Sequence, residues 1–257
     1  MLKRWRRWRE DRQLARIILS PDQWQQAVAV YPRADQFSPQ LLSRWQDLTL
    51  RFLLRKQFYS GSGFEITDAV RLRIAAMATL PVIGLGLDWY DDWHSIVVYE
   101  GAFIPPFEEH DEYGLVHHHR DARSGEAWQH GPVILSWEDV CDADHAGYNV
   151  VIHELAHKLD MRNGDADGYP PLHREMSPAR WQQVMQAAWE ETSQAAMHGH
   201  PMLLDSYGLE GPEEFFSVLS EHFFMLPESL KSHWPEVYEQ LVLFYRHDPM
   251  SPVLYPW

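Results

Sequence analysis

The sequence is poor in cysteine, in basic side chains and in long apolar runs. Cys141 is the only cysteine among 257 residues, so an internal disulfide is excluded and a reducing compartment, the cytoplasm, is predicted. Lys and Arg total 22 against 37 Asp and Glu, a net charge of −15, which argues against broad nucleic-acid affinity because phosphate neutralisation needs many cations. The longest apolar run, 74–87, contains Pro81 and falls short of the ~20 residues of a membrane span.

What remains is the composition of a folded globular protein, with 45% hydrophobic and 23% charged residues. No internal repeat, low-complexity tract or linker divides the chain, so we predict a single domain over residues 21–257. Apolar spacing and helix-start signals indicate helices at 21–57, 67–80, from 147, 178–197, 212–225 and 234–245. β-Branched runs indicate strands at 95–99 and 132–137. The predicted fold class is α+β, mostly helical with a small mixed sheet.

Residues 1–20 are expected to form a separate basic arm. The first 16 residues carry seven basic side chains against two acidic ones, a local charge of +5 that leaves −20 on the remainder. No apolar run follows, so a secretory signal is not expected. Interleaved Trp5 and Trp8 would suit contact with an anionic membrane or with DNA. A solvated terminus, or a helix docked on the acidic body, is the simpler interpretation.

The segment VVIHELAHKLD, residues 150–160, contains the pattern H-E-x-x-H. On a helix, positions i and i+4 share one face, so His153 and His157 can bind one metal ion. Glu154 lies beside them and can act on a metal-bound water without being a ligand. A zinc ion with three protein ligands keeps one position for water and lowers its pKa. The alternative, two satisfied core histidines, would bury them and a glutamate at a cost.

A third ligand is expected from the segment DSYGLEGPEEFFSVLSE, residues 205–221. Pro212 suits the first turn of a helix, on which Glu214 is in phase with Val218 and Glu221. Glu213 would point about 100° away and be solvated. His153, His157 and Glu214 would form a gluzincin-type site for one zinc ion per chain, in a zincin-like fold.

The two runs HELAHKLDMRNGD and DSYGLEGPEEFFSVLSEHFF resemble the Mlc titration factor A family, which is distantly similar to the catalytic domain of anthrax lethal factor. The similarity extends over residues 64–249. It implies a cytoplasmic, aminopeptidase-like zinc peptidase that binds the glucose-responsive repressor Mlc and relieves repression of glucose phosphotransferase genes. It also implies His153, His157 and Glu214 as ligands, Glu154 as base, and Tyr207 as the phenol that donates to the oxyanion.

Physical chemistry is consistent with the implied role of Tyr207, because peptide hydrolysis builds negative charge on the carbonyl oxygen and a neutral donor stabilises it. A core or loop tyrosine is the alternative. Outside the ligands, Asp160 follows His157 by three residues and could accept a hydrogen bond from a ligand histidine. Alternatively, its side chain could hold the loop that follows the helix. Thermolysin-like sites often carry Asp four residues after the glutamate ligand, where this chain has Val218. Asp160 and Glu221 are therefore the candidates.

Three functions follow from these patterns. The first is a zinc peptidase acting on peptides, for which the strand at 133–137 could offer an edge to an extended substrate. The second is a non-catalytic module that sequesters an Mlc-type repressor and keeps a vestigial or regulatory zinc site. The third, direct DNA binding by residues 1–16, conflicts with the acidic body. The natural substrate, the amino- or endopeptidase preference, the oligomeric state and the partner surface are not encoded in any pattern recognised in the sequence.

Overall fold

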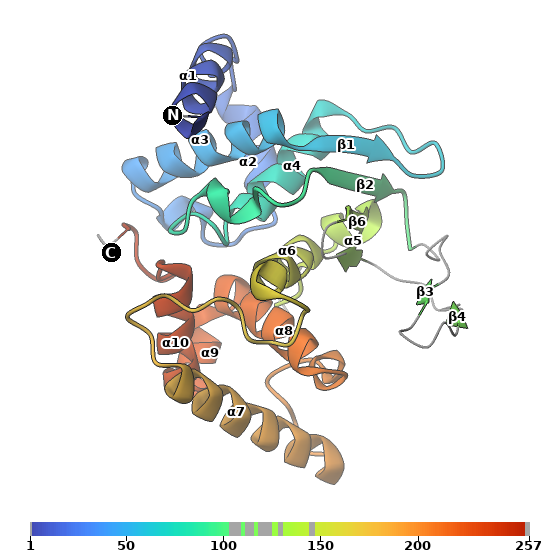
Figure 1. Ribbon diagram of the computed structural model, residues 1–257, viewed down its shortest axis with the longest axis vertical. Coiled ribbons are helices and arrows are strands. Elements are labelled where there is room, and N and C mark those ends of the chain that lie inside the picture. Colours follow the sequence, from blue (N-terminus) through green and yellow to red (C-terminus); the bar gives the residue numbers. More distant parts are fainter. Residues whose placement is uncertain are drawn as a thin grey trace.

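The computed structural model describes residues 2–102, 109–110, 116–117, 125–127, 131–143 and 147–254, and this part of the chain is mostly helical with one four-stranded sheet (Figure 1). The predicted α+β class is confirmed. The helices are α1 (Leu2–Leu14), α2 (Pro21–Val28), α3 (Pro39–Arg55), α4 (Asp68–Thr79), α5 (Trp137–Cys141), α6 (Val150–Asp160), α7 (Pro178–His198), α8 (Pro212–Met225), α9 (Pro227–His233) and α10 (Pro235–Tyr245), with 3-10 turns η1 (Ala34–Gln36), η2 (Leu87–Tyr90), η3 (Met161–Asn163) and η4 (Ser206–Leu209).

The sheet has the order β1 (Gln57–Ser60), β2 (Ser95–Tyr99), β6 (Val133–Ser136), β5 (Gly125–Ala127). The first three strands are parallel and β5 is antiparallel to β6, so the sheet is mixed, as predicted. All four residues of β6 are buried, as expected for a central strand. A separate two-stranded ribbon pairs β3 (Glu109–His110) with β4 (Val116–His117).

The position of β6 excludes one possibility raised by the sequence. The strand at 133–137 could have offered an edge to a substrate, but β2 and β5 pair with β6 on either side, with Val133 opposite both Ile96 and Ala127. The outer strand on this side of the sheet is β5. Its sequence, Gly-Glu-Ala, has too few β-branched or aromatic residues to indicate a strand.

The predicted helix at 21–57 is also wrong in its extent, because it is divided into α2 and α3 and its end is strand β1. Pro39 starts a new helix, and the side chain of Ser38 caps it by accepting a hydrogen bond from the Leu41 backbone at 3.3 Å. The predicted segments at 67–80, 95–99, 178–197, 212–225 and 234–245 match α4, β2, α7, α8 and α10, with every end within one residue. Helices α5 and α9 were not predicted.

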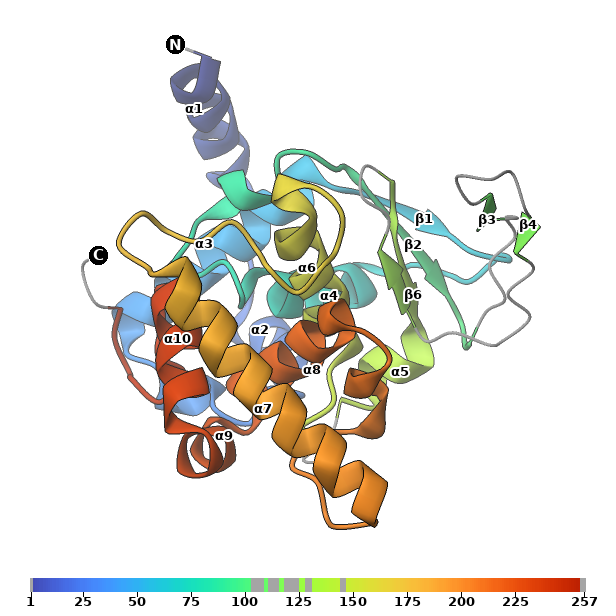
Figure 2. The same ribbon diagram turned by 60° about the horizontal axis from the view of Figure 1, so that its bottom comes forward.

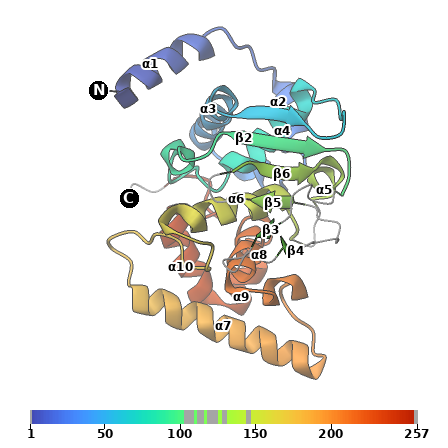
Figure 3. The same cartoon turned by 45° about the vertical axis from the view of Figure 1, so that its right-hand side comes forward.

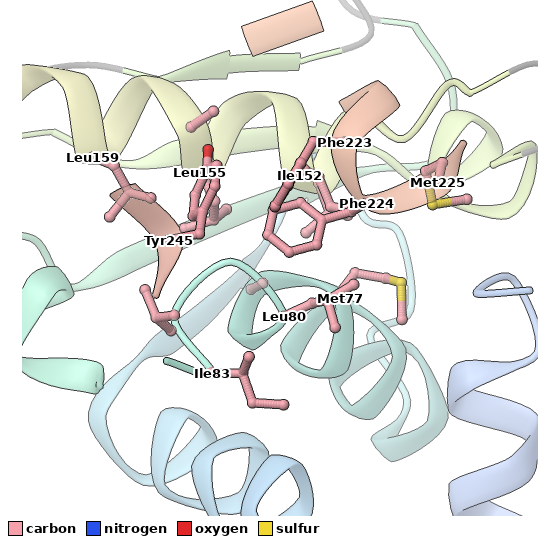
Figure 4. Packing of buried hydrophobic residues seen from close by; sticks show 14 of the residues in the cluster. Met77, Leu80, Ile83, Ile152, Leu155, Leu159, Phe223, Phe224, Met225 and Tyr245 are labelled. Carbon is pink, nitrogen blue, oxygen red and sulfur yellow. The ribbon is translucent and has the colours of Figure 1, made fainter. Parts of the chain in front are cut away.

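Helix α6 lies inside the molecule, between the sheet and α8, and all eleven of its residues are buried (Figure 3). Its apolar side chains meet those of α4, α8 and α10 in one core (Figure 4). This packing fixes α6 on several sides, so the histidines that it carries are held on a rigid element. The labelled core residues are Ile152, Leu155, Leu159, Met77, Leu80, Ile83, Phe223, Phe224, Met225 and Tyr245.

Helix α1 extends beside α3 at one end of the molecule (Figures 2 and 3). Glu10 is 5% exposed and forms ion pairs with Arg51 at 3.2 Å and Arg55 at 2.8 Å, both on α3. Arg6 pairs with Asp91 at 2.9 Å. Of the two simpler interpretations of the basic segment, the docked helix therefore describes it better than a solvated terminus. Its assignment as a separate arm stays a prediction.

None of the helices in the described ranges is both long and apolar enough to cross a membrane.

Candidate metal centre

The H-E-x-x-H segment forms α6, as predicted. Asn149 caps the helix by accepting a hydrogen bond from the Ile152 backbone at 3.1 Å through its side-chain oxygen. His153 and His157 are buried one turn apart, with ring centroids 4.9 Å apart. Their Nε2 atoms are 3.2 Å from each other. The helix therefore presents two imidazole nitrogens at one point.

Helix α8 brings Glu214 to the same point. Pro212 begins this helix, and Glu214 lies in its first turn, half-buried. Its Oε2 is 2.9 Å from Nε2 of His153 and 3.4 Å from Nε2 of His157. Glu213, which the helical phase predicted to point elsewhere, is not part of this cluster in the described part of the chain.

These three side chains fit a zinc ion. One nitrogen or oxygen from each of them lies within 4.8 Å of the others. Ligand atoms about 2.0–2.1 Å from one tetrahedral ion are about 3.3 Å apart, and the three distances above, 2.9, 3.2 and 3.4 Å, lie around that value. Two imidazoles and one carboxylate are also a known donor set for zinc sites with a position left for water.

The electrostatics of the cluster favour a bound cation. Burial lowers the pKa of His153, but hydrogen bonds to Glu214 and Glu221 outweigh it and raise this pKa well above its ordinary value. Burial raises the pKa of Glu214, but hydrogen bonds from His153 and His157 lower it overall. The carboxylate is therefore held ionised against the histidines, where a divalent cation would take the place of a shared proton.

Glu154 is 4% exposed, and burial raises its pKa to about 8. Its Oε2 is buried without a hydrogen-bond partner among the described residues. A Cβ atom built on Gly125 of β5 would lie 2.3 Å from Oε1 of Glu154. The backbone of the outer strand thus passes directly over this carboxylate, and only glycine leaves space for that approach.

Of the two candidates for support outside the ligands, the structure places Glu221 against a histidine. Its Oε1 is 2.8 Å from Nδ1 of His153, and its Oε2 accepts a hydrogen bond from the Asn149 backbone. Asp160 instead accepts backbone hydrogen bonds from Asp167 at 2.9 Å and Gly168 at 2.7 Å. Asp160 therefore holds the loop after the helix, which is the alternative interpretation of this residue.

Glu221→Gln is expected to weaken zinc binding about tenfold, because the carboxylate that orients His153 becomes a neutral amide. The fold should persist, since Gln has the same size and keeps an oxygen for the Asn149 backbone. Competition with a zinc-binding dye measures the affinity, with Asp160→Asn as the matched variant of a buried carboxylate that holds only the loop. Equal zinc affinity in wild type and Glu221→Gln would contradict this role.

Tyr207 lies beside the ligands, on η4. Its ring centroid is 5.7 Å from that of His153, and the side chain is 45% exposed. Asp205 precedes η4 and caps it by accepting a hydrogen bond from the Tyr207 backbone at 2.8 Å. The phenol is thus next to the site and open to solvent, which excludes the core-tyrosine alternative.

Gly125 and the loop 202–205 were not predicted as part of the site. Gly125 approaches Glu154 as described, and the loop residues line a cavity that begins at His153. An isolated glycine can mark a close backbone approach, but β5 itself gave no strand signal that would have directed attention to it. The loop consists of three ordinary apolar residues and Asp205, and their place beside the site comes only from tertiary packing.

Comparison with known proteins shows the family to which the chain belongs. The sequence model of a family described as glucose-regulated metallo-peptidase M90 matches residues 5–246, further toward the N-terminus than the resemblance recognised in the sequence. A protein of Klebsiella pneumoniae (strain 342) named Mlc titration factor A is 37% identical over 233 residues, 90% of this chain and 88% of that protein. A protein of the same name from Cronobacter sakazakii is 38% identical over 235 residues, with the same shares covered. The chain therefore belongs to the M90 family of glucose-regulated metallopeptidases.

Proposed function

We propose that this protein is a zinc-dependent, aminopeptidase-like peptide hydrolase with one zinc ion per chain. His153, His157 and Glu214 would hold the metal, which when bound supplies a Lewis acid and lowers the pKa of a water molecule. The observation that carries the proposal is the triangle of candidate ligand atoms with distances of 2.9–3.4 Å beside the carboxyl group of Glu154.

Glu154 would act as general base and then as general acid. It would take a proton from the attacking water and deliver it to the leaving amine. Burial raises its pKa to about 8, close to the neutral range in which one group can both take up and release a proton. With no partner on Oε2 in the described part of the chain, the group has a lone pair available for that proton.

Tyr207 and β5 would position the substrate. The exposed phenol of Tyr207, beside His153, could donate a hydrogen bond to the oxygen on which negative charge develops. The outer strand β5 carries Gly125 over Glu154. An extended peptide paired with this strand would bring its backbone to the site by β-augmentation, a role first considered for the strand at 133–137.

We also propose that the protein binds an Mlc-type transcriptional repressor and so relieves repression of glucose phosphotransferase genes. The support is the name of the relatives, Mlc titration factor A, with 37–38% identity. The alternative is a sequestering module in which the zinc site is vestigial or regulatory. The exposed free thiol of Cys141 suits the cytoplasm, where such a repressor acts. The acidic body gives no reason to expect direct nucleic-acid binding.

Removal of the metal tests the enzymatic proposal. Elemental analysis of the purified protein should find about one zinc per chain, and peptide turnover on the same sample should disappear on chelation and return when zinc is added. The His153→Ala variant should contain no zinc and have no turnover. Absence of zinc from wild type, with no activity gained on adding it, would contradict the proposal and leave repressor binding as the function to pursue.

A further inference from the structure

A cavity of about 570 Å³ opens from the candidate metal centre into the space between α6, α8 and the loop before η4. Gly125, His153, Glu154 and Tyr207 line its near side, so it begins at the groups that would act on a peptide. A substrate bound at the site would therefore have one of its side chains directed into this space.

Away from these groups the lining of the cavity is predominantly apolar, although the rings of Tyr148 and His222 also contribute to it. A side chain that enters the cavity would exchange part of its water contacts for apolar neighbours. Met202 and Leu203 are half-buried, while the other aliphatic lining residues are buried. These lining residues are Val150, Met202, Leu203, Leu204 and Val218.

The charged groups of the cavity select against acidic side chains. No lysine or arginine is among the described residues that line it, so away from the metal centre these residues offer an aspartate or glutamate of the substrate no counter-charge. Its own carboxylates, on Glu154, Glu221 and Asp205, would repel one.

Two of those carboxylates are already engaged, which limits their attraction for a basic side chain. Glu221 contacts Nδ1 of His153 at 2.8 Å and accepts from the Asn149 backbone. Asp205 accepts from the Tyr207 backbone at 2.8 Å. A lysine or arginine would compete with these bonds, whereas an aliphatic or aromatic side chain would not.

We infer that this cavity is the specificity site of the enzyme and binds an apolar side chain, such as that of leucine, methionine or phenylalanine, from a residue next to the scissile bond. The inference rests on the proposed peptidase function and names its substrate class. Discrimination between side chains that differ by several methylene groups in such a cavity is about tenfold or more.

A set of peptides tests the inference. The parent is tetra-alanine amide with a free amino terminus, in which one alanine at a time is replaced by Leu, Phe, Lys or Asp, and mass spectrometry identifies the cleaved bond. We expect Leu or Phe at one position flanking that bond to raise kcat/KM about tenfold or more over Lys and Asp. Calorimetry with the Glu154→Gln variant, which should bind without turnover, should give the same order of affinities.

Variants of Leu203 connect the preference to the cavity. Leu203→Trp should fill the space and reduce the preference for Phe over Ala about tenfold, mainly through KM, while Leu203→Ala should favour larger aromatic side chains. Leu42, a half-buried leucine on α3 outside the cavity, gives the matched controls Leu42→Trp and Leu42→Ala, which should keep the wild-type preference. Zinc content of each variant confirms that the site is intact.

Failure of the inference is distinct from failure of the proposed function. Cleavage of the peptides with equal rates for Leu, Lys and Asp, or with a preference for Lys, would overturn the apolar specificity and keep the peptidase. An apolar preference that Leu203→Trp leaves unchanged would overturn the assignment to this cavity. If zinc-loaded wild type cleaves no peptide of the set, and zinc-loaded Glu154→Gln binds none of them, both the apolar specificity and the peptidase function would be overturned.

Discussion

Replacing Glu154 by glutamine is expected to lower peptide turnover by about three orders of magnitude while zinc stays bound. The amide cannot accept the proton of the attacking water, and general acid–base catalysis contributes about 10²–10⁴ in rate. The proposed ligands are unaffected, since His153, His157 and Glu214 remain and Gln has nearly the same volume. Steady-state kinetics, with elemental analysis of the same sample, gives both quantities.

Comparison of Glu154→Gln with His153→Ala distinguishes the role of a general base from that of a metal ligand. The alanine variant should lose zinc and turnover together, whereas Glu154→Gln should lose only turnover. Glu154→Gln that keeps wild-type turnover would contradict the assignment of the base, whatever its zinc content.

The same variant separates the two proposed roles. A protein that relieves repression by sequestering an Mlc-type repressor should do so equally well as Glu154→Gln, because binding needs no proton transfer. A protein that acts by cleavage should lose this effect together with turnover. A reporter gene under the repressor, with binding of purified repressor measured in parallel, distinguishes these outcomes.

Helices α6 and α8, and the site residues that they carry, could be predicted from the sequence because helical spacing is a local property. His153 and His157 are four residues apart, and the phase of α8 selects Glu214 over Glu213 without any knowledge of the fold. The apolar residues that bury α6 also follow this spacing. The positions where α6 and α8 meet were thus encoded in two short segments.

The surroundings of the site depend on non-local pairing, which no local pattern determines. Gly125 matters because β5 pairs with β6 and so crosses Glu154. Glu221 and Asp160 were equal candidates along the sequence, and the angle between α8 and α6 decides that Glu221 contacts His153. A strand of three residues between segments outside the described ranges has too little periodicity to be recognised.

Tyr207→Phe is expected to lower kcat about 10²–10³-fold, the cost of removing one donor to a developing oxyanion. KM should change little, since the phenol would bind the transition state more tightly than the substrate. The ring itself contacts His153 and Phe keeps that contact, so zinc content should equal that of wild type. The chain supplies a matched control in Tyr148, a second tyrosine that lines the cavity and has no proposed role in catalysis, and Tyr148→Phe should keep kcat within about threefold. A Tyr207→Phe variant with wild-type kcat would assign oxyanion stabilisation to the metal alone and leave this tyrosine as a wall of the site.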